Sequence, residues 1–253
     1  MSTEPTLLID KRKGVVTLTI NRPHRRNALD PATYGALSHA LQDADRSNDV
    51  NVIVITGADN NFTAGNDLQE FQKRGGGESA GMSFLRVLVK VQTPIVAAVE
   101  GYALGVGVTM LQHCDYVYVA ENASMKLPFV NLGLCPEGAS SLLLARLVGQ
   151  RKASDWLLSG RTFTGTEAAQ SGFATSATLP GEALAHAQKT AEYLCTQPRD
   201  ALRLTKVMLR APLEEAIDQT LTYEAEQFAA RLQTAEAQQA FAQFFEKSAS
   251  KKK

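Results

Sequence analysis

The chain has 253 residues, of which 44% are hydrophobic, and this is enough for a substantial buried core. Its 26 basic and 26 acidic residues give a formal net charge of zero, which excludes a global field that would attract nucleic acid or an anionic membrane. The N-terminus lacks the apolar core of a signal peptide, no apolar run reaches the roughly 18 residues that cross a bilayer, and the three widely spaced cysteines favour reduced thiols, so we expect a cytoplasmic protein.

The N-terminal part of the chain predicts alternating strands and helices. Residues 7–20 contain two β-rich runs around a turn and predict a hairpin. A helix is expected after Asp30, which can cap it, because apolar side chains then repeat at a spacing of three and four. Residues 50–56 and 95–99 have the short apolar pattern of buried strands, and an apolar helical stripe at 84–91 lies between them.

Beyond about residue 130 the apolar periodicity becomes that of helices. The helical segments are expected at 142–147, 153–158, after the capping residue Thr164, at 184–194 and at 213–245. We therefore predict an α/β core over residues 1–195 and a helical C-terminal region over residues 196–253. The glycine run at 75–77 predicts a loop.

Two glycine-containing turns each follow an apolar strand and lead toward a helix. The first is NFTAGNDL at 61–68, and the second is GYALGVGV at 101–108. Glycine permits tight backbone paths and a helix N-terminus presents unpaired N–H groups, so two such turns can direct two amides at one oxyanion. The pattern alone favours turns that serve only packing. A dinucleotide site is not indicated, because Met110 stands where G-x-G-x-x-G requires its third glycine.

Three segments resemble motifs of the crotonase (enoyl-CoA hydratase/isomerase) family. FTAGNDL resembles its F-x-A-G-x-D-[LI] turn, GYALGVG its G-x-x-x-G-x-G turn, and NRPHRRNAL its N-R-P-x-x-x-N-A-[LM] segment. The resemblance extends over essentially the whole chain. It implies a crotonase fold, a spiral of repeated ββα units followed by a helical region that builds a homotrimer or hexamer. It also implies an acyl-CoA thioester substrate, with no separate cofactor and no metal.

The resemblance further implies which residues contact the substrate. The backbone N–H groups of Ala64 and Val106 would form the oxyanion hole, and Val106 stands where many members have glycine. A valine is tolerable there because the main chain is the donor. The implied CoA-contacting residues are Arg25, Arg26, Ala64, Asn66, Asp67 and Leu68. From the residues alone, solvated surface is the favoured interpretation of the cationic group at 24–26, and Asp67 is expected to order its own turn.

The acidic residues separate the possible reactions. Family hydratases typically use two glutamates, and Thr109 and Phe129 occupy those positions here. Neither side chain exchanges a proton at neutral pH, which argues against ordinary hydration. LGLCPEGASS at 132–141 resembles the L-G-x-x-P-E-G-x-S-S segment of the Δ3,Δ2-enoyl-CoA isomerase branch, in which the glutamate after proline shuttles the proton. Without that resemblance, Glu137 would be interpreted as a residue favoured by the macrodipole of the next helix.

Isomerisation of a 3-enoyl-CoA to a 2-enoyl-CoA is the function that we expect, with Glu137 as the single proton shuttle. Alternatives within the family are enoyl-CoA hydration and thioester hydrolysis, in which Glu137 would position water. An alternative of another class is a non-catalytic acyl-CoA-binding protein, which the absence of the two hydratase acids supports.

Two helical stripes in the C-terminal region are candidates for contact with the substrate or with another subunit. The basic stripe consists of Arg199, Arg203, Lys206 and Arg210. Solvated surface is its favoured interpretation, ahead of contact with a CoA phosphate across a subunit boundary. The apolar stripe consists of Leu221, Ala225, Phe228 and Leu232. It has more apolar surface than an isolated terminal helix should expose, which indicates a trimer or a multiple of it. Glu100 and Asp115, at strand edges, are expected to support the site or the trimer without catalysing.

Overall fold

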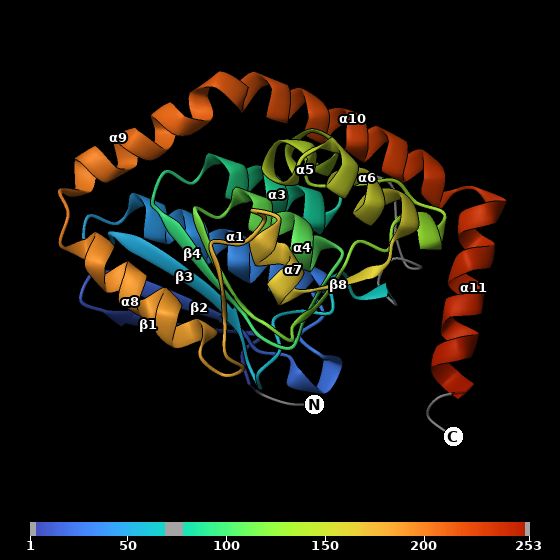
Figure 1. Cartoon of the computed structure of the whole chain (residues 1–253), viewed down its shortest axis with the longest axis horizontal. Coiled ribbons are helices and arrows are strands. Elements are labelled where there is room, and N and C mark those ends of the chain that lie inside the picture. The colour runs from blue at the N-terminus through green and yellow to red at the C-terminus, as the bar shows by residue number, and fades with distance from the viewer. Residues whose placement is uncertain (1–3, 69–77, 251–253) are drawn as a thin grey trace.

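The computed structural model describes residues 4–68 and 78–250, which form a mixed α/β structure with two sheets surrounded by helices (Figure 1). The predicted loop at 75–77 lies outside the described residues. No helix within those described ranges combines the length and the apolar character that crossing a bilayer requires.

The larger sheet has six strands in the order β1-β2-β3-β4-β6-β9. Its strands are β1 Leu7–Arg12, β2 Val15–Ile20, β3 Val52–Gly57, β4 Ile95–Val99, β6 Tyr116–Ala120 and β9 Ser176–Thr178. β1 and β2 form the predicted antiparallel hairpin, and the other neighbouring strands are parallel. All residues of β4 are buried, as expected for a parallel strand that is covered on both faces.

The smaller sheet has three strands in the order β5-β7-β8. Its strands are β5 Tyr102–Leu104, β7 Ser124–Lys126 and β8 Thr162–Thr164. The chain passes from β4 to β5 and from β6 to β7, so successive strand pairs are divided between the two sheets. This arrangement confirms the expected α/β class and places the glycine turns that follow β3 and β4 beside one another.

Helices cover both sheets, and the cap predicted at Asp30 is present. Asp30 Oδ1 accepts the Thr33 N–H at 2.8 Å, at the start of α1. α8 packs its alanines on the apolar face of β3 and β4. The helices of this part are α1 Pro31–Arg46, α3 Ala80–Lys90, α4 Val106–Thr109, α5 Ser140–Val148, α6 Gln150–Ser159, α7 Gly165–Gln170 and α8 Ala183–Cys195. The short 3-10 helices are η1 Pro23–Arg25, η2 Met110–His113, η3 Val130–Leu132 and η4 Ala211–Leu213.

The C-terminal region consists of α9 Arg199–Arg210, α10 Glu214–Leu232 and α11 Ala235–Ser250. Figure 1 shows α9 and α10 as a nearly continuous arch along one side of the molecule, with α11 turning away from the end of α10. The single helical stretch predicted at 213–245 is therefore two helices. Thr234 separates them, and its hydroxyl accepts the Ala237 N–H at 3.3 Å.

The apolar stripe of α10 faces the chain's own core. Leu221, Phe228 and Leu232 are buried there, so the expectation that this stripe needs another subunit to cover it was wrong. Most of the large apolar side chains that the C-terminal region exposes lie instead on α9. They are Leu204, Met208 and Leu209, the last of them 77% exposed.

The basic stripe of α9 is engaged within the chain. Arg203 Nη1 lies 3.2 Å from Asp45 Oδ1, and Lys206 Nζ lies 2.7 Å from Asp115 Oδ2. Arg210 also pairs with Asp115, and burial lowers the pKa of Lys206 to about 8, although Asp115 opposes that shift. The solvated interpretation was therefore wrong, because the acceptors come from segments that are distant in sequence.

Candidate active site

The two glycine turns are locked together by close contacts between their backbones. Thr63 and Ala103 form a parallel bridge, in which the Leu104 N–H donates to the Thr63 carbonyl at 3.1 Å. A Cβ at Gly65, whose φ is +83°, would lie 2.4 Å from the Leu104 carbonyl oxygen. A Cβ at Gly107 would lie 2.6 Å from Thr63 Cγ2. Both glycines are therefore required by the approach of one turn to the other.

The backbone N–H groups of Asn66 and Val106, one in each turn, have no hydrogen-bond partner among the described residues. Val106 is the first residue of α4, so its N–H has no acceptor within the helix. Asn66 lies opposite Leu29 in an isolated bridge, in which Leu29 bonds the residues on either side of Asn66. The Asn66 N–H is thereby directed away from Leu29. The turns thus offer two unpaired donors of the kind that stabilises an oxyanion.

Ala64 is not one of those donors. Its N–H donates to the carbonyl oxygen of Arg26 at 3.0 Å. Arg26 itself adopts a left-handed backbone conformation, with φ at +55°, directly after the 3-10 helix η1. The prediction that Ala64 supplies the first oxyanion N–H was therefore wrong, because that N–H already has an acceptor, and the position two residues later has the unpaired N–H.

A cavity of about 340 Å³ lies beside the two turns. Its wall is largely apolar and includes Leu104, Pro128, Phe129, Leu134, Phe228 and Phe244. Ala64, Asn66 and Leu68 line it from the first turn, and α11 closes part of its outer side. Among the described residues that line it, Lys126 and Glu137 alone carry a formal charge. An apolar cavity with few polar groups is typical of a small-molecule site.

Glu137 is 8% exposed and contacts the first turn. The Asn66 side-chain amide donates to Glu137 Oε1, with 3.4 Å between the nitrogen and the oxygen. The hydroxyl of Tyr34, which is buried on α1, donates to Asn66 Oδ1. This contact orients the amide so that its NH2 group faces Glu137. The structure therefore brings the candidate acid/base beside the residue whose backbone N–H is unpaired.

The backbone directly after Glu137 is left-handed and is fixed by hydrogen bonds to its carbonyl groups. Gly138 and Ala139 have φ of +73° and +58°, in the left-handed region that disfavours alanine. The Ser140 hydroxyl donates to the Glu137 carbonyl at 2.5 Å. Burial lowers the pKa of His113 to about 4, so its ring is neutral at pH 7, and Nε2–H donates to the Gly138 carbonyl at 2.9 Å.

The two positions at which the resemblance implies hydratase acids serve packing. Thr109 is buried, and a Cβ at Gly138 would lie 3.0 Å from its Cβ and its Oγ1. Phe129 lies edge-on to Phe228, with 6.4 Å between the ring centroids, and both rings line the cavity. A hydrophobic wall therefore stands where a second acid would be needed.

The residues implied as CoA contacts are only partly in the cavity. Arg25 Nη2 lies 3.1 and 3.2 Å from the two carboxylate oxygens of Asp67, which is buried and also pairs with Arg22. Asp67 thus orders its own turn. Arg26 is exposed, and it contributes its backbone carbonyl to the Ala64 contact. CoA contacts by these charged residues stay a prediction.

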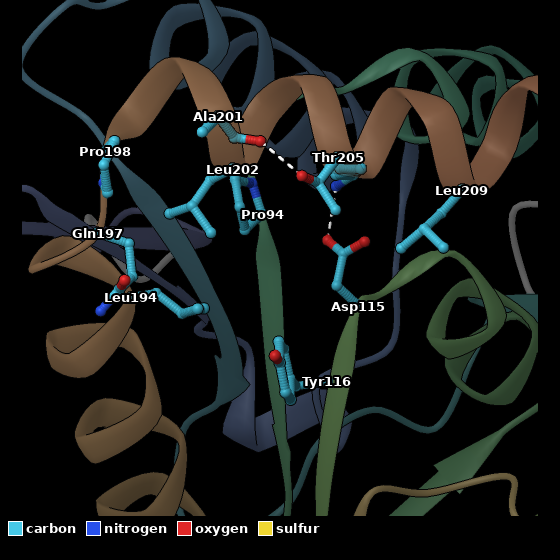
Figure 2. A pocket seen from close by; sticks show the side chains of 11 residues that line it. Pro94, Asp115, Tyr116, Leu194, Gln197, Pro198, Ala201, Leu202, Thr205 and Leu209 are labelled. Atoms are coloured by element: carbon cyan, nitrogen blue, oxygen red, sulfur yellow. Dashed lines mark hydrogen bonds and ion pairs between the residues drawn. The ribbon is translucent and has the colours of Figure 1, made fainter.

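A second cavity, of about 260 Å³, lies between the end of α8, α9 and the starts of β4 and β6 (Figure 2). Figure 2 shows Asp115 directed toward α9, the helix whose Lys206 forms an ion pair with it. This cavity shares no lining residue with the cavity of Glu137. Asp115 therefore holds α9 against the sheet and lies outside the cavity of Glu137.

Sequence reasoning missed two residues behind Glu137, which are Tyr34 and Glu224. Tyr34 lies among the buried side chains of α1, where the helical spacing predicts packing alone. Glu224 is 3% exposed on α10, and its carboxylate bonds the segment after Glu137. A signal was available, since Glu224 lies three residues after Leu221 and four before Phe228, within an apolar stripe. A charged residue at such a position indicates a specific buried partner.

The chain matches known proteins over nearly its whole length. The family model described as enoyl-CoA hydratase/isomerase matches residues 10–252. A probable enoyl-CoA hydratase of Mycobacterium leprae is 32% identical over 247 residues, which cover 96% of each protein. The 1,2-epoxyphenylacetyl-CoA isomerase of Escherichia coli is 32% identical over 228 residues, covering 86% of this chain and 87% of the relative. An enoyl-CoA hydratase/isomerase from Pseudoalteromonas atlantica has a TM-score of 0.92 and 37% identity, covering 96% of this chain and 97% of that one. These matches confirm the expected crotonase fold.

Proposed function

The chain belongs to the enoyl-CoA hydratase/isomerase family, and from that premise we propose that it isomerises a 3-enoyl-CoA to the conjugated 2-enoyl-CoA. The observation that carries the proposal is the single acid: Glu137 is the only carboxylate among the described residues that line the cavity. Moving a double bond needs one group that removes a proton and returns it elsewhere, whereas hydration must also activate water.

The proposed proton circuit runs between two carbons of the acyl chain. Glu137 removes a proton from C2 of the 3-enoyl thioester, and the thioester oxygen takes the charge of the resulting dienolate. The N–H groups of Asn66 and Val106 stabilise that oxygen, with Asn66 replacing Ala64 as the first donor. Glu137 then returns the proton at C4, which leaves the double bond between C2 and C3. The circuit requires no metal and no separate cofactor, since CoA is part of the substrate.

Hydration of a 2-enoyl-CoA is the second candidate, because several relatives are named as enoyl-CoA hydratases. Glu137 would then have to deprotonate water and also supply the proton that C2 receives. The side chains of Thr109 and Phe129 offer no second acid for that task. Spectroscopy of a 3-enoyl-CoA and a 2-enoyl-CoA, incubated separately with the enzyme, distinguishes the two reactions.

In that experiment, isomerisation predicts that the 3-enoyl-CoA gains the absorbance of a conjugated thioester, while the 2-enoyl-CoA keeps most of its absorbance and yields no 3-hydroxyacyl-CoA. Loss of that absorbance from the 2-enoyl-CoA, with a 3-hydroxyacyl-CoA as product and faster than any change in the 3-enoyl-CoA, would assign the enzyme to hydration. Repeating both incubations with several chain lengths also defines the acyl group that the cavity accepts.

The enzyme is further proposed to assemble as a trimer or a multiple of it. The support is the exposed apolar surface on α9 at Leu204, Met208 and Leu209, which is larger than isolated surface side chains require. Light scattering at micromolar concentration measures the mass directly. A trimeric or hexameric mass is expected, and a monomeric mass would contradict the assembly while leaving the chemistry untouched.

A further inference from the structure

We propose that Glu224, on α10, is a positioning residue that holds the catalytic glutamate in place through the backbone after it. Glu224 Oε2 accepts the Ala139 N–H at 2.6 Å, and Oε1 accepts the Ser141 N–H at 2.8 Å. One carboxylate thus bridges two amides that follow Glu137 by two and four residues. This inference rests on the proposed role of Glu137 as the acid/base.

The segment needs an external partner because its own sequence supplies none. α5 begins at Ser140, and its N-cap residue is Ala139, whose side chain cannot accept a hydrogen bond. The first N–H groups of a helix have no acceptor within the helix, and they attract negative charge. Ala139 is also held in a left-handed conformation that alanine disfavours. The Glu224 carboxylate compensates for both features.

Burying the Glu224 carboxylate for this contact is unfavourable by itself. Glu224 is buried, and burial raises its pKa even though it accepts backbone hydrogen bonds. A buried carboxylate is unfavourable unless its oxygens are hydrogen-bonded, and both oxygens of Glu224 are. One helical turn further along α10, Phe228 lines the cavity. α10 therefore contributes both a wall of the site and the support of its acid.

The other supports of the segment act on its carbonyl groups. His113 bonds the Gly138 carbonyl, and the Ser140 hydroxyl bonds the Glu137 carbonyl. Removing the Glu224 acceptor leaves these contacts in place, so we expect the segment to shift rather than to unfold. A shift of the acid relative to the bound thioester lowers the rate of proton transfer more than it lowers substrate binding.

The chain contains a matched control for this arrangement at the start of α8. Glu100 Oε1 accepts the Gly181 N–H and the Ala183 N–H, both at 3.0 Å. Glu100 is thus also a distant carboxylate that bonds two amides at a helix N-terminus. None of these three residues lines the cavity of Glu137. Glu100→Gln therefore reports what the loss of such a contact does to stability alone.

The experiment compares kcat, KM and the thermal unfolding midpoint of Glu224→Gln and Glu100→Gln on the best 3-enoyl-CoA. Glutamine has only one acceptor oxygen, and its NH2 group opposes one of the two N–H groups. We expect Glu224→Gln to lower kcat at least about tenfold while KM changes less than about threefold. Glu100→Gln should keep kcat within about twofold of the wild-type value, even if its thermal unfolding midpoint falls as far as that of Glu224→Gln. Wild-type kcat in a folded Glu224→Gln variant overturns the inference.

A double-mutant cycle tests whether Glu224 acts through Glu137. In a Glu137→Gln background, Glu224→Gln should lower the residual turnover by less than about twofold, because the group that it positions is already lost. A further tenfold loss in that background overturns the inference. If Glu137→Gln itself retains wild-type turnover, the proposed function fails instead. If Glu224→Gln does not fold, the test uses Glu224→Asp, which keeps the charge but is too short to bond both N–H groups. A fall in kcat of about fivefold or more at unchanged KM then supports the inference. Wild-type kcat in Glu224→Asp overturns it.

Discussion

The two halves of the candidate site, the glycine turns and the Glu137 segment, are built in different ways. The turns offer backbone N–H groups, and the contact of Gly65 with the Leu104 carbonyl fixes their spacing. The acid is a side chain whose position depends on contacts from α1, η2 and α10. The first half is therefore insensitive to most side-chain changes, whereas the second depends on residues that are distant in sequence. This difference predicts where substitutions should act.

The largest effect is expected at the acid itself. Glu137→Gln keeps the size of the side chain but cannot exchange a proton, and positioned acid/base groups contribute about a hundred- to ten-thousandfold. We expect kcat on the best 3-enoyl-CoA to fall within that range, while the Kd of a CoA ester stays within about threefold. Turnover and calorimetric binding measure the two quantities. A variant that retains more than about a tenth of the wild-type turnover is incompatible with a proton shuttle.

In the turns, only a change to the main chain should matter. Val106→Pro removes the N–H at the first position of α4, where proline is tolerated, and we expect a loss of about a hundredfold in kcat. Val106→Ala keeps the N–H and should retain most of the activity. Steady-state kinetics on folded proteins provide the comparison. Equal activity of the two variants would exclude the Val106 N–H from the oxyanion hole.

A smaller effect is expected at Tyr34, which acts on Glu137 through Asn66. Tyr34→Phe removes the hydroxyl that orients the Asn66 amide, and a hydrogen bond of this kind is worth about 1 kcal/mol, so kcat should fall about fivefold. Tyr193→Phe removes an exposed hydroxyl on α8 and is the control. If both variants match the wild-type kcat, the hydrogen bond from Tyr34 to the Asn66 side-chain amide does not contribute to turnover.

The smallest effect on activity, but a measurable one on stability, concerns His113. Its pKa is about 4 in the folded protein, against an ordinary value of 6.5. Between those values the unfolded chain binds a proton at His113 and the folded chain does not, so the free energy of unfolding falls as the pH drops from 6.5 toward 4. The loss should reach roughly 3 kcal/mol.

Denaturant unfolding at pH 7.5 and at pH 4.5 measures the His113 effect against His113→Gln. Glutamine can still donate to the Gly138 carbonyl but does not titrate in this range. The variant should therefore lose less stability than the wild type on acidification. An identical loss in both proteins would assign the acid sensitivity to other groups.

The elements that sequence reasoning predicted well are those whose cause is local. The Asp30 cap and the β1–β2 hairpin each depend on neighbouring residues. The prediction of Ala64 as a donor was wrong because the Arg26 carbonyl, which belongs to another segment, accepts the Ala64 N–H. The same reason explains the partners of the basic stripe and the contact of Glu224. A sequence pattern locates such residues but does not identify what they touch.

The central claim is that one carboxylate moves a proton from C2 to C4, and isotope transfer tests it most directly. A 3-enoyl-CoA deuterated at C2 would be converted in a single turnover in ordinary water, and the product would be analysed by NMR. The account predicts a conjugated 2-enoyl-CoA with deuterium at C4, because Glu137 returns part of what it removed. A product without deuterium at C4, or a 3-hydroxyacyl-CoA, would contradict it.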